Sequence, residues 1–181
     1  MPRTVGRTSF QLSLLWRVYS QVPQSRQRKG GAGRDRATEE TVNLGPPHAP
    51  KEESIKVFND IKHELKKSLV HIRHEHNKHE PEYFAAVDHL SDSDLAGFDA
   101  DDFDEVRVAS SAYGIHLFGR VRIPALPEDG PAYIHFRAFT SGPEHDAKLH
   151  SIHTEEKDEP DGGKTFRAIF TKNDALEWFD T

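Results

Sequence analysis

One apolar stripe constrains the fold of this chain more than any other feature. Between residues 52 and 72, hydrophobic side chains recur at steps of three and four, which places them on one face of an α-helix. Glu52 and Glu53 fall in the first turn, where the helix dipole favours acids, and Pro81 ends the helix. A long helix of this kind must pack its apolar face against another element. The stripe consists of Ile55, Phe58, Ile61, Leu65, Leu69 and Ile72.

Alternating segments after the helix predict its partner, an antiparallel sheet. Turn signals separate them, among them PALPEDGP at 124–131 and Pro160-Asp-Gly-Gly163. His135 and Arg137 alternate with apolar neighbours, so we expect them on the solvent face of a half-buried strand. The fold class that follows is α+β, with one long helix packed on an antiparallel sheet of four to five strands. The expected strands are 106–111, 115–123, 133–140, 148–156 and 164–171.

The charge pattern divides the chain near residue 42. Residues 1–34 include seven Lys or Arg and no acid, whereas the remainder carries an acidic excess. We expect residues 1–41 to be a basic, disordered extension, or a product of a start codon assigned too far upstream. A mitochondrial presequence over residues 1–35 is the alternative, because the segment is Arg-rich and acid-free around an amphipathic patch. Residues 42–181 then form the domain, with an acidic insertion at 84–104.

The acidic stretch SDSDLAGFDADDFDE (91–105) invites a calcium interpretation that the spacing does not support. Counting from Asp92, the fifth and twelfth positions of an EF-hand loop fall on Ala96 and Phe103, neither of which offers a side-chain oxygen. A solvated acidic loop is the expectation instead.

Motifs of metal sites, enzymes and membrane spans are also missing from the sequence. His71, His74, His76 and His79 lie close together, but no acid or Cys completes a recognised ligand spacing. The chain has no Cys, no catalytic signature and no apolar run of about 20 residues. We therefore expect no enzymatic activity, no cofactor, no metal and no membrane partner. The acidic body argues against nucleic acid as a partner.

Four stretches together resemble the cystatin family, and specifically its stefin branch. YIHFRAFTSGPEH (133–145) is similar to the family's fourth strand and second hairpin, and Tyr113-Gly114 followed by IHLFGRVRI to its first hairpin and third strand. KNDALEWF (172–179) resembles the closing Asp-x-Leu-x-aromatic-Phe, and Leu44-Gly45 the N-terminal trunk. The likeness runs from about Leu44 to Thr181, with insertions at roughly 84–102 and 147–163.

The resemblance implies a reversible, non-covalent inhibitor of papain-like cysteine proteases. In that family the sheet wraps the helix, and the trunk and two hairpins form a wedge that enters the protease cleft. The first hairpin departs from the family's Gln-x-Val-x-Gly pattern and keeps only its glycine, and Gly142 stands where Leu is common. The implied contact residues are Leu44, Gly45, Ser110, Ser111, Ala112, Tyr113, Gly114, Gly142 and Pro143.

The alternative is a cystatin-like interaction module that does not inhibit proteases. Both hypotheses predict the same fold, a cytoplasmic location and a monomer, with a domain-swapped dimer as a further state that edge strands allow. If the first hairpin contacts a protease, Gly114→Glu should weaken inhibition without unfolding the domain.

Overall fold

The computed structural model describes residues 42–142 and 145–180. Helix α2 spans Glu52–His79 and ends two residues before Pro81, with Glu80 as its C-cap. Its buried face includes Phe58, Ile61, Leu65 and Leu69, as the stripe predicted. Ile55 and Ile72, at the two ends of the stripe, are half-buried. The predicted basic extension lies outside the described residues.

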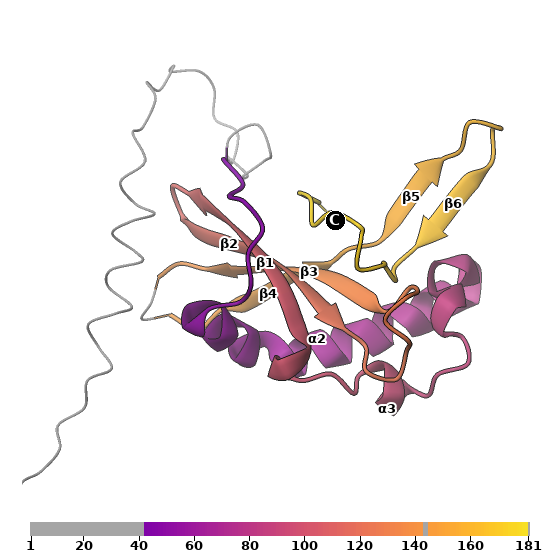
Figure 1. The fold of residues 1–181 in the computed structure, drawn as a ribbon, viewed down its shortest axis with the longest axis horizontal. Helices are drawn as coiled ribbons and strands as arrows, with labels where there is room; N and C mark the ends of the chain where they lie inside the picture. The colour runs from indigo at the N-terminus through magenta and orange to yellow at the C-terminus, as the bar shows by residue number, and fades with distance from the viewer. Residues whose placement is uncertain (1–41, 143–144, 181) are drawn as a thin grey trace, which may run out of the picture.

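A four-stranded antiparallel sheet packs on this helix (Figure 1). The strands are adjacent in chain order, and the apolar side chains on the helix side of the sheet join those of α2 in the main core. The α+β architecture predicted from the sequence is thus confirmed. The strands are β1 (Phe103–Ser111), β2 (Gly114–Arg122), β3 (Tyr133–Thr140) and β4 (Lys148–Ile152).

The segment before the helix pairs with the edge strand β1 through two isolated bridges. Leu44 bridges to Ala109 and His48 to Val106, both antiparallel. The Gly45 N–H donates to the Val108 carbonyl at 2.8 Å. The trunk expected from the resemblance therefore runs along β1 in this structure.

A separate hairpin of β5 (Glu155–Asp158) and β6 (Lys164–Arg167) projects from the body (Figure 1). The predicted strand 148–156 is thus divided between two sheets. The division falls at His153, whose N–H still bonds the His135 carbonyl at 2.9 Å but whose ring stacks on Phe170 and Phe179. The chain leaves the main sheet after this residue.

The acidic segment is not the solvated loop that its composition predicted. It follows the turn η1 (Pro81–Val87) and forms the short helical turns α3 (Asp92–Leu95) and η2 (Ala100–Asp102). Leu95 and Phe98 are fully buried, with Phe98 6.4 Å from the Phe58 ring. The acids face water while these apolar side chains complete the core.

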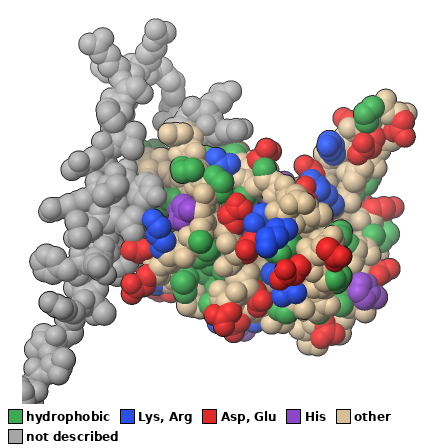
Figure 2. All heavy atoms as spheres, viewed as in Figure 1, with side chains coloured by type: hydrophobic (Ala, Val, Ile, Leu, Met, Phe, Trp, Pro, Cys, Tyr) green, Lys and Arg blue, Asp and Glu red, His purple; other side chains and the backbone are tan. Residues whose placement is uncertain are grey.

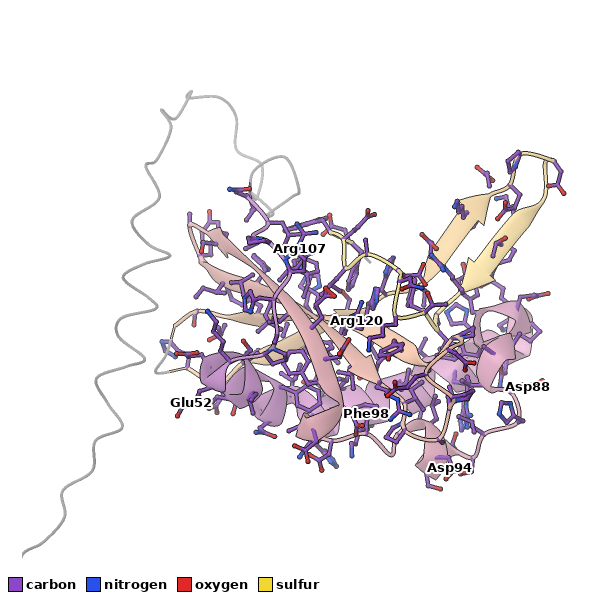
Figure 3. All side chains as sticks on the ribbon, viewed as in Figure 1. Glu52, Asp88, Asp94, Phe98, Arg107 and Arg120 are labelled. Atoms are coloured by element: carbon purple, nitrogen blue, oxygen red, sulfur yellow. The ribbon has the colours of Figure 1, made fainter. Side chains whose placement is uncertain are left out.

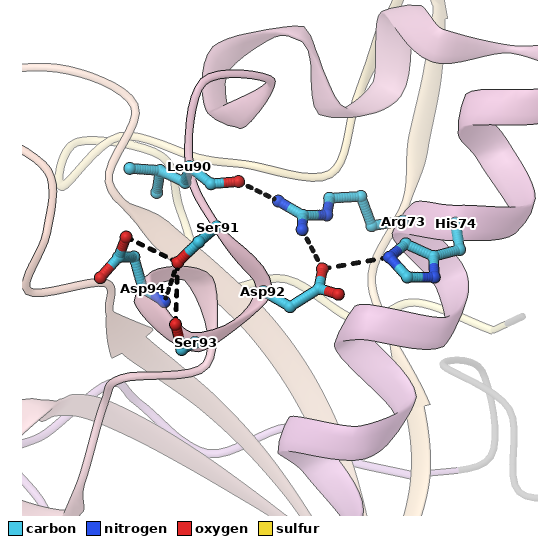
Figure 4. A network of polar contacts seen from close by, with 7 residues as sticks. All are labelled: Arg73, His74, Leu90, Ser91, Asp92, Ser93 and Asp94. Atoms are coloured by element: carbon cyan, nitrogen blue, oxygen red, sulfur yellow. Dashed lines mark hydrogen bonds and ion pairs between the residues drawn. The ribbon is translucent and has the colours of Figure 1, made fainter.

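Arg73 ties this segment to α2 (Figure 4). Its guanidinium donates to the Leu90 carbonyl at 2.8 Å and pairs with the carboxylate of Asp92, which His74 also contacts at 3.1 Å. Loss of hydration raises the pKa of Asp92, but the hydrogen bonds from Arg73 and His74 outweigh it, so its pKa lies below the ordinary value. Ser91 caps α3 by accepting from the Asp94 N–H.

The prediction that His135 and Arg137 face solvent is wrong. They are 1% and 2% exposed, because the end of the chain covers the sheet face opposite α2 (Figure 1). A second, small core of Phe118, Leu176 and Phe179 lies there. The sheet therefore has an inner face against the helix and an outer face against the C-terminal segment.

Candidate functional site

The candidate site is the end of the sheet where the trunk and two turns meet. Leu44 bridges to Ala109, two residues before the end of β1. Ser111 pairs with Gly114 across the first hairpin, and Ile115 pairs with Thr140, two residues before Gly142. The strand register thus brings together three segments far apart in the sequence.

The first hairpin turns through Ala112 and Tyr113, and both are exposed. The Ser111 hydroxyl holds the turn, donating to the Gly114 carbonyl at 3.1 Å and accepting from the Tyr113 N–H at 3.3 Å. Tyr113 is 63% exposed, and among the described residues it stands out as the exposed large hydrophobic side chain. Such a ring on a braced turn is suited to contact another protein.

The second turn follows β3 and is braced in a similar way. The Thr140 hydroxyl donates to the Gly142 carbonyl at 2.9 Å, and the His145 N–H donates to the same carbonyl at 3.2 Å. Gly142 is described and buried, whereas Pro143 lies outside the described residues. The predicted role of this tip therefore stays a prediction.

Gly114, at the start of β2, lies against the end of β3. Its φ is +152°, and a Cβ placed there would lie 2.3 Å from the Thr140 carbonyl oxygen and 2.8 Å from the Phe139 ring. Both facts require glycine, since L side chains rarely adopt this backbone and the obstructing oxygen is main chain. Gly114→Glu should therefore strain the domain, so that substitution does not separate a loss of binding from a loss of stability.

We expect Gly114→Ala to lower the free energy of unfolding by about 1–3 kcal/mol, because the methyl group forces β2 and β3 apart. Urea unfolding followed by circular dichroism measures the loss. Gly130→Ala is the matched control, since a Cβ at Gly130 meets no atom within 4 Å and its φ is not positive. Equal stability of the two variants would contradict the steric argument.

The trunk is fixed by Arg107, a residue that the sequence prediction missed. Its Nε donates to the Gly45 carbonyl at 2.7 Å, and its Nη1 donates to the Leu176 carbonyl at 2.8 Å. Arg107 is labelled in Figure 3, between the trunk and the C-terminal segment. No pattern in the sequence indicates this role, because Arg107 binds backbone carbonyls. Ser110, by contrast, contributes a buried hydroxyl without a hydrogen-bond partner among the described residues.

His116 lies beside the site on β2, beneath the aromatic rings of Phe139 and Trp178 at 5.0 and 6.0 Å. Burial, reinforced by the neighbouring Arg137 guanidinium, lowers the pKa of His116 to about 4. The imidazole is therefore neutral at pH 7, and its Nδ1 can accept from Arg137 Nη2 at 3.3 Å.

The described residues show neither a metal site nor a membrane-spanning helix. The described residues contain no group of three or more His, Cys, Asp or Glu placed to share a metal ion. His74 contacts the Asp92 carboxylate, and the His76 ring lies tilted against that of Tyr83, with the ring centroids 4.2 Å apart. None of the helices in the described ranges has the length and hydropathy of a bilayer crossing. Acidic and basic side chains are interspersed over the face drawn in Figure 2.

Comparisons of this chain with protein-family models, with curated proteins and with solved structures found no match.

Proposed function

We propose that this chain is a reversible, non-covalent inhibitor of papain-like cysteine proteases. The observation that carries the proposal is the meeting of Leu44, the Ala112–Tyr113 turn and Gly142 at one end of the sheet. A wedge needs three backbone segments side by side, and the resemblance to the stefins names these same segments. The helix packed on an antiparallel sheet is compatible with this family's fold.

The physical argument is preorganisation. The turn hydroxyls of Ser111 and Thr140 and the Arg107 guanidinium hold the three segments before any partner arrives. A preformed edge loses little conformational entropy on docking, so most of the contact energy appears as affinity. Non-covalent blocking also needs no reactive group.

A non-inhibitory interaction module remains the second candidate, and two observations favour it. The Leu44 side chain packs against the small core of Phe118, Leu176 and Phe179, so part of its apolar surface is already used. The hairpin also offers small side chains at Ser110 and Ala112, where the family has Gln and Val. Both features reduce the contact area available to a protease.

Titration of papain with the full-length chain separates the two candidates. We expect saturable inhibition that dilution reverses, and binding of papain whose active-site thiol is alkylated, because the wedge needs no chemistry. Mass spectrometry should find the inhibitor uncleaved. An absence of inhibition at about 100 μM chain, which corresponds to a binding free energy weaker than about −5.5 kcal/mol, would rule out the inhibitor.

We expect Tyr113→Asp to weaken inhibition about 30-fold or more, since a buried aromatic anchor contributes about 2 kcal/mol or more and a carboxylate would be desolvated in its place. The inhibition constant against papain is the measurement. Ala125→Asp is the control, because it places the same charge on an exposed residue in the link between β2 and β3, at the opposite end of these strands. Equal inhibition constants for the two variants would exclude the first hairpin from the contact.

A further inference from the structure

The outer face of the sheet carries arginines from three successive strands. Arg107 on β1 is in register with Phe118 on β2, and Phe118 with Arg137 on β3. Arg120, labelled with Arg107 in Figure 3, lies two residues further along β2 than Phe118. Arg120 and Arg137 are 7% and 2% exposed, so this row of cations is covered.

The cover is the C-terminal strap, defined here as residues 172–180. Each arginine donates to a different strap carbonyl: Arg120 to Lys172 at 2.8 Å, Arg107 to Leu176 at 2.8 Å and Arg137 to Phe179 at 3.1 Å. Arg137 also pairs with the Asp180 carboxylate. The guanidinium groups thus supply the donors that a neighbouring strand would otherwise offer.

Two strap rings complete the contact. Phe179 meets Phe118 edge to face at 5.4 Å, in a small core separate from the main one. The Arg137 guanidinium lies 4.3 Å from the Trp178 ring and 5.3 Å from the Phe118 ring. A cation between two rings is a strong and specific recognition element.

The strap donates few backbone hydrogen bonds. In the described ranges, no N–H of residues 175–180 donates to a backbone carbonyl, and the nearest such bond runs from Asp174 to Thr171 at 3.2 Å. Leu176 and Phe179 are buried, whereas Ala175, Glu177 and Asp180 are exposed. Side chains of the sheet therefore hold the strap, and detaching it breaks no strand pairing.

We propose that the outer face is a peptide-binding site, which the strap occupies in cis and which accepts an extended segment of another protein. The fitting partner carries Leu, any residue, two aromatic residues and an acid in that order. Recognition uses backbone carbonyls, two rings and one carboxylate, and none of these requires covalent linkage to this chain. The proposal is independent of protease inhibition.

The strap competes with an incoming segment for the outer face and so lowers the apparent affinity of that segment. A tethered segment acts as a competitor at an effective concentration of about 1 mM or more, so a free peptide of equal affinity binds only weakly to the intact chain. A weakened strap should therefore reveal the site. Replacement of the strap by another segment would also change the contacts of the trunk. Arg107 joins Gly45 to Leu176, and Leu44 packs on the same small core as the strap.

A fluorescent synthetic peptide with the sequence of residues 172–181 tests this site. The protein is the full-length chain with Trp178→Ala and Phe179→Ala. We expect it to bind the peptide at least about 10-fold more tightly than the wild-type chain, because its own strap competes poorly. Adding Arg137→Ala should remove the binding, and a peptide with alanine at both aromatic positions should not bind.

Two results would overturn the proposal. The first is a weakened-strap variant with unchanged helical circular dichroism that leaves the peptide unbound. The second, which needs no variant, is hydrogen exchange of the wild-type chain in which amides 175–180 are as protected as those of β2 and β3. Dimers of the variant that the free peptide dissociates would assign the face to a second copy of this chain instead.

Discussion

The domain should lose stability steeply as the pH falls below about 6.5, before its carboxylates titrate. Burial lowers the pKa of His135 to about 3 and that of His116 to about 4, and it also lowers the pKa of His153 and His150. In the unfolded chain these imidazoles bind protons near pH 6.5, whereas in the folded domain they stay neutral. Protons therefore favour the unfolded state over the whole interval.

His135 should dominate this effect. Its ring stacks on Phe170 at 4.3 Å and an interplanar angle of 7°, and neither ring nitrogen has a hydrogen-bond partner among the described residues. A charge there would meet His153, Arg120 and Arg167, with only Asp174 as a favourable neighbour. The described residues offer the proton on His135 no acceptor and no counter-ion in contact.

The expected slope is about 1.4 kcal/mol of unfolding free energy per pH unit for each imidazole kept neutral, between its folded pKa and about 6.5. Above pH 6.5 this contribution is fully present, and it is lost as the pH falls toward 4 and then 3. Urea unfolding at half-unit steps from pH 8 to pH 4 measures the slope.

His135→Phe isolates the contribution of the buried imidazole. Phenylalanine keeps the stack on Phe170 but cannot bind a proton, so we expect the slope between pH 6 and 4 to fall by about 1.4 kcal/mol per unit. The same pair of proteins at pH 8, where both carry no charge at this position, gives the packing difference alone. A slope that the substitution leaves unchanged would show that His135 is protonated in the folded state.

The inner half of the molecule could be predicted because its burial follows the period of its elements. The stripe of α2 and the alternation of β1, β2 and β3 direct apolar side chains to one common core. Leu176 and Phe179, in the closing segment that resembles the family's, are buried as well. In these regions, local pattern and tertiary environment agree.

The outer face could not be predicted because its residues look solvated. Arg120, Arg137 and His135 occupy polar positions of alternating strands, and nothing local indicates that carbonyls from residues 172–179 will meet the arginines. The acidic segment was predicted to be a solvated loop for the same reason, because its many charges outweigh the two apolar residues Leu95 and Phe98, which are buried. Burial of these residues depends on segments distant in the sequence.

For the candidate site, the residues could be predicted from the sequence, but their proximity in space is known only from the strand register of the structure. The likeness to a known family named Leu44, Tyr113 and Gly142, while only the pairing of Ser111 with Gly114 and of Ile115 with Thr140 brings their segments together. Arg107 was missed because a side chain that binds backbone carbonyls requires no particular partner residue. A contact of that kind leaves no pattern in the sequence.

Phe58→Ala should cost about 3–5 kcal/mol of unfolding free energy, the largest loss that we expect from a single substitution in this domain. The Phe58 ring is fully buried at the meeting point of helix, sheet and acidic segment. Its centroid lies 5.1 Å from that of Phe103, 6.0 Å from that of Phe136 and 6.4 Å from that of Phe98. Three rings would thus face the cavity.

Val57→Ala is the matched control, because it also truncates an apolar side chain to alanine in the same turn of α2 but at a half-buried position. We expect it to cost about 1 kcal/mol, so urea midpoints should separate the two variants clearly. Phe58→Leu, which retains part of the volume, should fall between them. If Phe58→Ala cost no more than Val57→Ala, the four rings would not form one packed unit. The acidic segment would then have to dock on the helix through polar contacts such as those of Arg73 with Asp92 and Lys62 with Asp99.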